Sequence, residues 1–361
     1  MNTQLRRAAT AATALTMAVS LAACGEAGSG KEDEADNKTI GLLLPESRTT
    51  RYEAFDYPLI KAKVQELCGD CKINYKNAAE NVSTQKQQFD DLVSSGVKVI
   101  ILDAVDSGAT KSWVDGAEKK GVKVVAYDRL AEGNVAAYVS FDNEKIGKLQ
   151  GEGIVQALGD KAADARVVMI NGKESDPNAA MFKKGAHSVL DKQVKEIVYE
   201  QTGEWSAEIA GQKMGAAITS LGKDGFDAVY SANDGMAGGI IAALDSAKVK
   251  DIPVGGQDAE LAGIQRILKG TQSFTIYKPY KPEAEPTAEI AVRLLQGKSI
   301  DDLATAKIDS PSTKGIPAAL VDAFVVTEDN IKDTVIKDKL YKVSEICKGE
   351  FKKACADAGI E

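Results

Sequence analysis

The sequence predicts an α/β fold built from two doubly wound parallel sheets. Short β-branched runs alternate with amphipathic helical segments along most of the chain. Runs such as Val97–Leu102 are apolar at nearly every position, which is typical of strands covered by helices on both faces. At 361 residues, the chain also exceeds the length that one core usually serves. Two βαβ sheets of about five strands each are therefore expected.

The first sheet is predicted from five runs in the first half of the chain. Ser, Asp or Asn residues precede several of the intervening helical segments, as N-caps do. In chain order the strands are Thr39–Pro45, Cys71–Asn77, Val97–Asp103, Val122–Asp128 and Ala136–Phe141, with helices at Ser83–Ser95 and Gly108–Lys120.

The same alternation repeats through the second half of the chain and predicts a second sheet of the same kind. Its strands are expected at Ala165–Asn171, Lys195–Glu200, Phe226–Ala232, Ile252–Gln257 and Ser273–Tyr277, with helices at Asn143–Leu158, Ser206–Leu221 and Gly235–Ala247.

The N-terminus has the layout of a bacterial lipoprotein signal. Arg6 and Arg7 precede an apolar run, Ala8–Val19, and Leu21-Ala22-Ala23-Cys24-Gly25 follows. The run is shorter than the roughly 20 residues that cross a bilayer. We expect residues 1–23 to be a signal peptide, Cys24 to be lipidated and 24–37 to be a flexible tether. An ordinary cleaved secretory peptide is the alternative, and both place the folded part outside the cytoplasm.

Charge and histidine content exclude several classes of partner. The net charge is -8, and acidic and basic residues are mixed along the chain without a basic block. Nucleic acid is therefore not an expected partner. His187 is the lone histidine, which argues against histidine-rich metal sites. We expect no metal and no cofactor.

Four cysteines follow Cys24, in two local pairs: Cys68 with Cys71, and Cys347 with Cys355. In an oxidising compartment an even number of cysteines indicates disulfides before metal. A zinc site made of the four thiols is the alternative, but the spacing of the second pair does not suit a zinc ribbon. Two local disulfides are the prediction.

Polar side chains follow the predicted strands at their carboxyl ends, where ligands of doubly wound sheets bind. Carboxylate, amide, guanidinium and ammonium groups at one crevice suit a ligand rich in hydroxyls, because each hydroxyl both donates and accepts. Aromatic rings would cover the apolar C–H patches of a sugar. Any one of these residues alone could be a solvated strand end. The residues are Arg51, Tyr52, Asp128, Arg129, Trp205, Asn233, Asp258 and Lys278.

From about Lys38 to Tyr341 the chain resembles the periplasmic sugar-binding proteins of ABC importers, and within them the D-xylose and multiple-monosaccharide binders. The segments that carry the resemblance are Ala126–Leu130, Ser140–Lys145, Gly256–Ile264, Gly270–Gln272, Tyr277–Pro279 and Asn330–Ile336.

The resemblance implies a type I binding fold, with two lobes joined by a three-segment hinge. The lobe boundaries that we expect are 38–139 plus 259–308 for the N-terminal lobe, and 140–258 plus 309–361 for the C-terminal lobe.

The resemblance also implies roles for individual residues. Arg51 and Tyr52 match an arginine-aromatic pair, although xylose binders usually carry Trp at the position of Tyr52. Asp128 is expected to bind the ligand, or else to brace Arg129. The other matching positions are Arg129, Asn178, Trp205, Asn233, Asp258 and Lys278, all expected to bind the ligand.

Three function classes are compatible with these features. The first is a monomeric, lipid-anchored binding subunit that delivers a monosaccharide, D-xylose first, to an ABC permease. The second is a sensor of glucose, galactose or arabinose that signals through a membrane receptor. The third is an enzyme with Asp128 and Asp258 as acid and base, but paired carboxylates in a sugar cleft more often bind hydroxyls. The importer subunit is the prediction.

Overall fold

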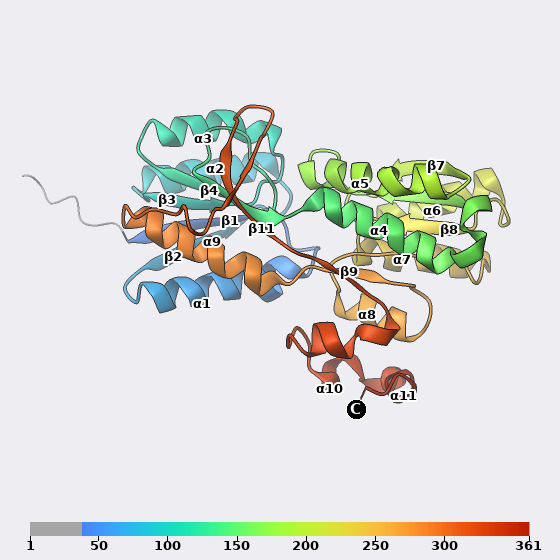
Figure 1. The fold of residues 1–361 in the computed structure, drawn as a ribbon. Coiled ribbons are helices and arrows are strands. Elements are labelled where there is room, and N and C mark those ends of the chain that lie inside the picture. Colours follow the sequence, from blue (N-terminus) through green and yellow to red (C-terminus); the bar gives the residue numbers. More distant parts are fainter. Residues whose placement is uncertain (1–37, 361) are drawn as a thin grey trace, which may run out of the picture. The chain divides into compact units, whose positions relative to one another are not determined.

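The computed structural model describes residues 38–360, which form two α/β lobes (Figure 1). The expected signal peptide (1–23), Cys24 and the tether (24–37) lie outside the described residues. Within 38–360, no helix has both the length and the apolar character that a membrane span requires.

The first lobe contains a seven-stranded sheet with the order β10-β11-β5-β4-β3-β1-β2. All pairings in it are parallel except that of β10 with β11. The strands are β1 (Thr39–Leu44), β2 (Lys72–Asn77), β3 (Val99–Leu102), β4 (Lys123–Tyr127), β5 (Ala137–Phe141), β10 (Ala306–Ile308) and β11 (Ile316–Val321).

Helices cover both faces of this sheet, which explains the continuous apolar runs. Ile101 in β3 packs on one face with α1 (Tyr57–Leu67) and α9 (Tyr280–Leu295). Its two neighbours along the strand, Ile100 and Leu102, pack on the other face with α2 (Val82–Ser94) and α3 (Lys111–Glu118). Successive side chains of a strand point to opposite faces, so both positions must be apolar.

The second lobe has a parallel core of three strands in the order β7-β6-β8, which residues 254–258, β9 and β12 extend. Helices α4 and α5 pack together, as do α6 and α7. The strands are β6 (Arg166–Asn171), β7 (Glu196–Thr202), β8 (Ala228–Ser231), β9 (Thr275–Tyr277) and β12 (Phe324–Val326); the helices are α4 (Asn143–Leu158), α5 (Pro177–Gln193), α6 (Ala207–Leu221), α7 (Asp234–Ala247) and α8 (Leu261–Leu268).

Close contact between α4 and α5 depends on glycine. A Cβ on Gly147 would lie 2.0 Å from the backbone oxygen of Phe182, and a Cβ on Gly185 would lie 2.1 Å from the backbone oxygen of Glu144. Any larger residue would separate the two helices. These contacts fix α5, whose first turn carries part of the candidate site.

The chain crosses between the lobes three times, as the predicted hinge requires. The crossings are at Asp142, between β5 and α4; at Lys278–Pro279, between β9 and α9; and at Asp322–Ala323, between β11 and β12. An exposed ion pair of 2.7 Å joins Lys145, just after the first crossing, to Asp322 in the third.

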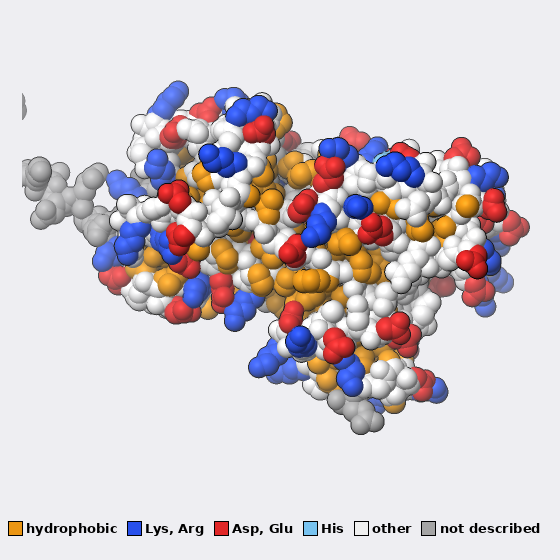
Figure 2. Space-filling model, in the orientation of Figure 1, with side chains coloured by type: hydrophobic (Ala, Val, Ile, Leu, Met, Phe, Trp, Pro, Cys, Tyr) orange, Lys and Arg blue, Asp and Glu red, His pale blue; other side chains and the backbone are white. Residues whose placement is uncertain are grey.

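Apolar side chains gather over the middle of the face drawn in Figure 2, whereas acidic and basic ones are interspersed around it. Leu320 and Phe324, which flank the third crossing, are 41% and 50% exposed. Because these exposed side chains have few packing partners, a movement of the lobes would break few of their packing contacts.

Strand pairing corrects two of the expected lobe boundaries. β9 lies in 259–308, assigned to the N-terminal lobe, yet its Ile276 exchanges backbone hydrogen bonds with Gly256 and Asp258 of the second lobe. β11 lies in 309–361, assigned to the C-terminal lobe, yet it pairs with β5 of the first sheet. The chain therefore returns to the first lobe after β9 and leaves it again after β11.

The ten predicted strands largely coincide with observed strands, with one difference. The predicted strand Ile252–Gln257 forms a single β-bridge, at Val254, together with scattered backbone hydrogen bonds. Among the described residues, the α-helices and strands outside the ranges expected above are α1, α5, α8, α9, α10 (Val343–Ile346), the last helix α11 (Lys352–Asp357), β10, β11 and β12.

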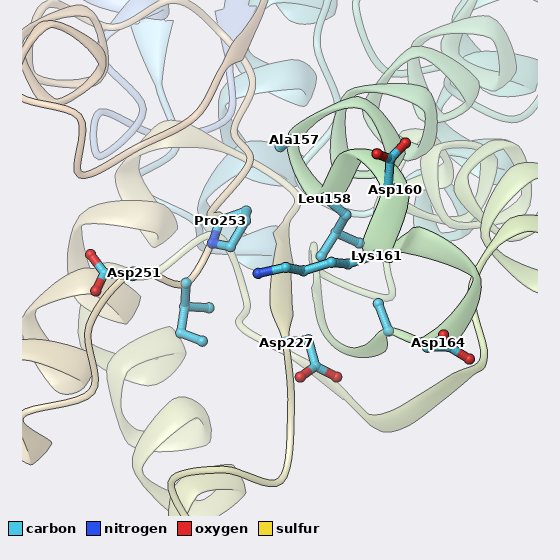
Figure 3. Close-up of a pocket in the computed structure, with 10 residues that line it drawn as sticks. Ala157, Leu158, Asp160, Lys161, Asp164, Asp227, Asp251 and Pro253 are labelled. Carbon is cyan, nitrogen blue, oxygen red and sulfur yellow. The ribbon is translucent and has the colours of Figure 1, made fainter.

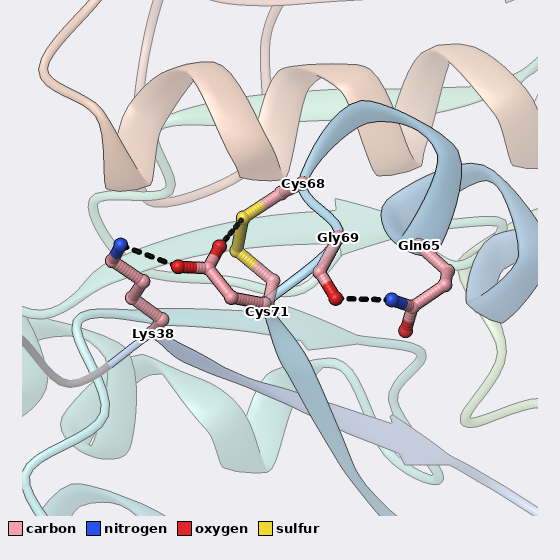
Figure 4. The surroundings of a disulfide bond; sticks show 6 residues. Lys38, Gln65, Cys68, Gly69 and Cys71 are labelled. Atoms are coloured by element: carbon pink, nitrogen blue, oxygen red, sulfur yellow. Dashed lines mark hydrogen bonds and ion pairs between the residues drawn. A yellow bond between two sulfur atoms is a disulfide. The ribbon is translucent and has the colours of Figure 1, made fainter.

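Residues after β12 form short helical turns, including α10 (Val343–Ile346) and α11, that pack on α8. A disulfide between Cys347 and Cys355, with 5.7 Å between Cα atoms, closes this segment. A second disulfide joins Cys68 to Cys71 at the C-terminus of α1, where Lys38 pairs with Asp70 at 2.7 Å (Figure 4). Both pairings are those expected from the sequence, and sulfurs bound in disulfides provide no thiolate for zinc.

Candidate functional site

A cavity with about 300 Å³ of empty space lies between the carboxyl ends of the strands of the two lobes. All nine residues that the sequence suggested as ligand contacts line it. They are Arg51, Tyr52, Asp128 and Arg129 from the first lobe, Asn178, Trp205, Asn233 and Asp258 from the second, and Lys278 from the second crossing. Four further lining residues were not predicted: Thr49, Asp176, Phe182 and Gln257.

Arg51 enters the site from the turn after β1, and buried carboxylates hold its guanidinium. Nε binds Asp56 at 2.7 Å, Nη2 binds Glu283 of α9, and Nη1 lies 3.2 Å from Asp128. Burial raises the pKa of Asp56 and the pKa of Glu283, and the positive charge of Arg51 offsets only part of this rise. Three carboxylates thus fix one arginine, and within residues 38–360 Nη1 has no partner of hydrogen-bonding geometry.

Asp128 follows β4 and braces Arg51. Oδ2 accepts a 3.1 Å hydrogen bond from the Tyr52 hydroxyl, and Oδ1 faces Arg51. Burial alone would raise the pKa of Asp128, but the charges of Arg51, Lys278 and Arg129 outweigh it and lower that pKa. The carboxylate therefore stays ionised. The suggestion that Asp128 braces Arg129 is not what the contacts show.

Arg129 is held instead by carboxylates from both lobes. Its Nε lies 2.9 Å from Asp176 of the second lobe and 3.7 Å from Asp103, which follows β3, while Nη1 donates to the backbone oxygen of Ala104 at 3.1 Å. Burial raises the pKa of Asp103 well above its usual value, and Asp128 adds to this. Asp103 was not predicted as a site residue, although it directly follows the apolar run Val99–Leu102, and the signal that singled out Asp128 could also have found it.

In the second lobe, the first turn of α5 presents Asn178. Its side-chain nitrogen donates to the backbone oxygen of Asp128 at 3.1 Å, and its side-chain oxygen accepts from Asn143 at 2.9 Å. Asp176 caps the helix by accepting from the backbone N–H of Asn178 at 2.9 Å. The cap explains why Asp176 belongs to the site: it orients α5, Arg129 and, through a 3.1 Å hydrogen bond, the indole of Trp205.

Trp205 is fixed between a glycine and a phenylalanine. A Cβ on Gly172 would lie 2.1 Å from the indole, so only glycine leaves room for the ring. Phe182 meets the indole edge-on, with 6.4 Å between ring centroids. Trp205 is buried and lines the cavity. An aromatic face of this kind suits the apolar side of a sugar ring.

Asp258 and Lys278 form a buried ion pair in which Nζ lies 2.9 Å from Oδ1. The ammonium also lies 5.6 Å from the ring centre of Phe141 and 5.7 Å from that of Phe182. Nearby, the side-chain oxygen of Asn233 caps α7 by accepting from Met236 at 2.9 Å. Because Lys278 belongs to a crossing segment, its contact with Asp258 links the hinge to the site.

Backbone strain collects at this cavity. Asp128, Trp205 and Asp258 have φ angles of 52°, 54° and 91°, which are uncommon for residues other than glycine. Each such residue costs on the order of 1–3 kcal/mol and persists where the surrounding structure enforces it, often at functional sites. The strain is consistent with side chains aimed at a ligand.

The lobes touch at the rim of the cavity. Lys173 of the second lobe lies 3.9 Å from Glu80 of the first, and the backbone N–H of Ser107 donates to the backbone oxygen of Ser175 at 3.5 Å. Gln257 presents a buried side-chain oxygen without a hydrogen-bond partner among the described residues. The two lobes are thus closed around polar groups that a ligand could satisfy.

A wider hollow, with about 1020 Å³ of empty space, lies at the amino ends of β6 and β8 (Figure 3). Lys161 and Asp227 are among its lining residues, together with Asp160, Asp164 and Asp251. None of the described residues that line it is aromatic, and it lies at the end of the strands opposite to the one where ligands of such sheets bind. The cavity between the lobes is the better candidate.

A family model for the periplasmic binding protein domain matches residues 40–299. The chain belongs to the periplasmic binding protein family. This confirms the resemblance and the type I fold expected from the sequence.

Relatives within the periplasmic binding protein family match most of the chain. The D-xylose-binding periplasmic protein of Escherichia coli is 34% identical over 342 residues, which cover 92% of this chain and 98% of that protein. The multiple sugar-binding periplasmic receptor ChvE of Rhizobium radiobacter is 28% identical over 333 residues, which cover 86% of this chain and 93% of that protein.

A solved structure agrees with this assignment. The carbohydrate transporter solute binding protein of Chloroflexus aurantiacus, in complex with D-glucose, matches with a TM-score of 0.77 at 25% identity, over 85% of this chain and 97% of that one.

Proposed function

We propose that this protein is the lipid-anchored, extracytoplasmic subunit of an ABC importer, that it binds a monosaccharide, D-xylose best, between its lobes, and that it is not an enzyme. The observation that carries the proposal is the composition of the cavity. Guanidinium, ammonium, amide and carboxylate groups from both lobes converge there beside the indole of Trp205. Each sugar hydroxyl can donate one hydrogen bond and accept others, so it can use both kinds of group.

The enclosed position of the cavity favours a small sugar. The thirteen residues that line it come from both lobes and the second crossing, and all of them are buried. D-xylose has no hydroxymethyl group outside its ring and needs less room than glucose. In a closed site, one such group changes binding by roughly 1–3 kcal/mol. Two relatives are named for binding D-xylose and for binding multiple sugars, which supports a monosaccharide as the ligand.

Closure would provide the signal for transport. Arg129 and Asp128 belong to one lobe and Trp205 and Asp258 to the other, so a sugar gains its full contacts only when the lobes meet. The ligand then shifts the population toward the closed form by its differential affinity for the two forms. A permease that binds the closed form would receive the loaded protein.

Isothermal titration calorimetry on the purified full-length protein tests the proposal. The panel contains D-xylose, D-glucose, D-galactose, L-arabinose, an amino acid and a nucleoside. We expect D-xylose to bind most tightly and D-glucose next. Binding of the amino acid or the nucleoside, with no heat from any monosaccharide, would refute the proposal. Tighter binding of galactose or arabinose would keep the sugar site but refute the choice of xylose.

A further inference from the structure

The strand end that carries Asp258 is a strained turn in which two successive residues have a left-handed backbone. Asp258 has a φ of 91° and Ala259 has a φ of 46°. Such conformations are costly for residues with a Cβ atom and persist only where the surroundings hold them. The contacts that hold this turn therefore decide where the Asp258 carboxylate points.

Hydrogen bonds fix the backbone of the turn at three consecutive positions. The N–H of Asp258 donates to a backbone oxygen of β9 at 2.8 Å. The N–H of Ala259 donates to the hydroxyl oxygen of Thr275 at 3.1 Å. The N–H of Glu260 donates to Oδ2 of Asp234 at 2.9 Å. Two of the three acceptors belong to side chains, so the turn depends on the residues at positions 234 and 275.

Asp234 and Thr275 form one buried network behind the turn. The Thr275 hydroxyl, which accepts from Ala259, donates in turn to Oδ2 of Asp234 at 2.9 Å. Oδ1 of Asp234 accepts from the side-chain amide of Gln272 at 2.6 Å. Both Asp234 and Thr275 are fully buried, and neither lines the sugar cavity. Contact with a bound sugar therefore does not explain these two side chains.

Two glycines leave room for the Asp234 carboxyl group. A Cβ on Gly256 would lie 2.0 Å from Oδ1 of Asp234, and a Cβ on Gly263 would lie 2.3 Å from Oδ2. The two glycines lie on either side of Asp258 in the chain. The segment that forms the turn is thus packed directly around this one carboxyl group.

We propose that Asp234, acting with the Thr275 hydroxyl, is a positioning residue for sugar binding, which holds the strained turn and so aims the Asp258 carboxylate into the cavity. The inference rests on the proposed function, because it concerns how Asp258 meets the ligand. Asp258 would contact the ligand directly, whereas Asp234 acts through Asp258.

Asp234→Asn keeps the shape of the side chain but cannot satisfy the network. Three donors surround the carboxyl group, whereas an asparagine offers one oxygen and an NH2 group that itself donates. If the oxygen faces the turn, the NH2 group faces the amide of Gln272. Turning that amide would break its hydrogen bonds with Arg266 and with the backbone oxygen of Phe274, both of 3.0 Å. If the oxygen faces Gln272, the NH2 group faces the N–H of Glu260. A buried donor is left without an acceptor in either case.

The test is calorimetry at about pH 8.5 with the compound of the panel above that the wild-type protein binds most tightly. Burial raises the pKa of Asp234 to about 7, so its carboxyl group is ionised at this pH. Asp234→Asn should bind about tenfold more weakly than wild type, because the ligand must first restore the turn. The exposed Asp245→Asn, also on α7, is the matched control and should bind as wild type.

A pair of variants at Thr275 tests the same network without changing charge. Thr275→Val replaces the hydroxyl by a methyl group and should also bind about tenfold more weakly, because the N–H of Ala259 loses its acceptor. Thr275→Ser keeps the hydroxyl and should bind within about threefold of wild type. This pair decides the question if Asp234→Asn does not fold, which circular dichroism checks.

A double-mutant cycle separates positioning from a general loss of stability. In an Asp258→Asn background the carboxylate that Asp234 positions is absent, so Asp234→Asn should cost less than about threefold in affinity there. A general destabilisation would weaken binding equally in both backgrounds.

Each outcome decides one question. Wild-type affinity in folded Asp234→Asn or in Thr275→Val would overturn the positioning role, and so would an equal weakening in the two backgrounds of the cycle. Binding of the amino acid or the nucleoside, with no heat from any monosaccharide, would instead refute the proposed function. The variants would then be compared with the compound that binds.

Discussion

Replacing Asp258 by Asn should abolish tight sugar binding while the protein remains folded. The substitution keeps the shape of the side chain but removes its charge. Asparagine is chosen over alanine because the φ angle at this position is 91°, a region that asparagine tolerates better than most residues. The other partner, Lys278, would still find a side-chain oxygen 2.9 Å away, but no longer a carboxylate.

The expected magnitude follows from the hydrogen bonds available to Asp258. Oδ1 binds Lys278, whereas no donor among residues 38–360 binds Oδ2, which is thus free for a ligand hydroxyl. A hydrogen bond to a charged group contributes about 1.5–3 kcal/mol. The weakened pair with Lys278 adds to the loss, because an unpaired buried charge is costly. A total of about 3 kcal/mol corresponds to roughly a 150-fold weaker Kd.

Calorimetry with D-xylose measures this change, and circular dichroism checks the fold. The matched control is Asp251→Asn, which also has a positive φ, 57°, but lies in the hollow at the other end of the sheet. The control should bind like wild type. A folded Asp258→Asn protein with a Kd within threefold of wild type would refute the assignment of Asp258 to the ligand.

Three further predictions concern other parts of the chain. Sugar should change the tryptophan fluorescence of the wild-type protein and of Trp113→Phe but not that of Trp205→Phe, because of the two tryptophans Trp205 lines the cavity and Trp113 does not. A fluorescence change in Trp205→Phe as large as in wild type would contradict this. Cys347→Ser should lower the free energy of unfolding by roughly 2–3 kcal/mol in denaturant titrations without changing sugar affinity; equal stability would show that the disulfide adds nothing. Cys24→Ser should release the protein from membranes in cell fractionation, and a variant that stays bound would count against lipidation.

The sequence predicted the strand ends well because strand periodicity and end polarity are local properties. Asp128, Asn233 and Asp258 each follow an apolar run directly, and the topology of parallel sheets brings such positions to one edge. Gln257 could have been found by the same signal, since it immediately precedes Asp258.

The residues that support the site were not predictable in this way. Glu283 lies in the first turn of α9 and is separated from Arg51 by 232 positions, and no local pattern distinguishes it from a surface glutamate. The lobe boundaries failed for a related reason. The partners of β9 and β11 are chosen by the packing of the whole domain, and local propensity says little about which sheet each strand joins.

A crystal structure of the protein grown with D-xylose would test the central claim most directly. We predict one sugar in the cavity between the lobes, hydrogen-bonded to Arg129 of the first lobe and Asp258 of the second, with its ring against Trp205. A sugar found elsewhere, or bound by residues of one lobe alone, would contradict the account.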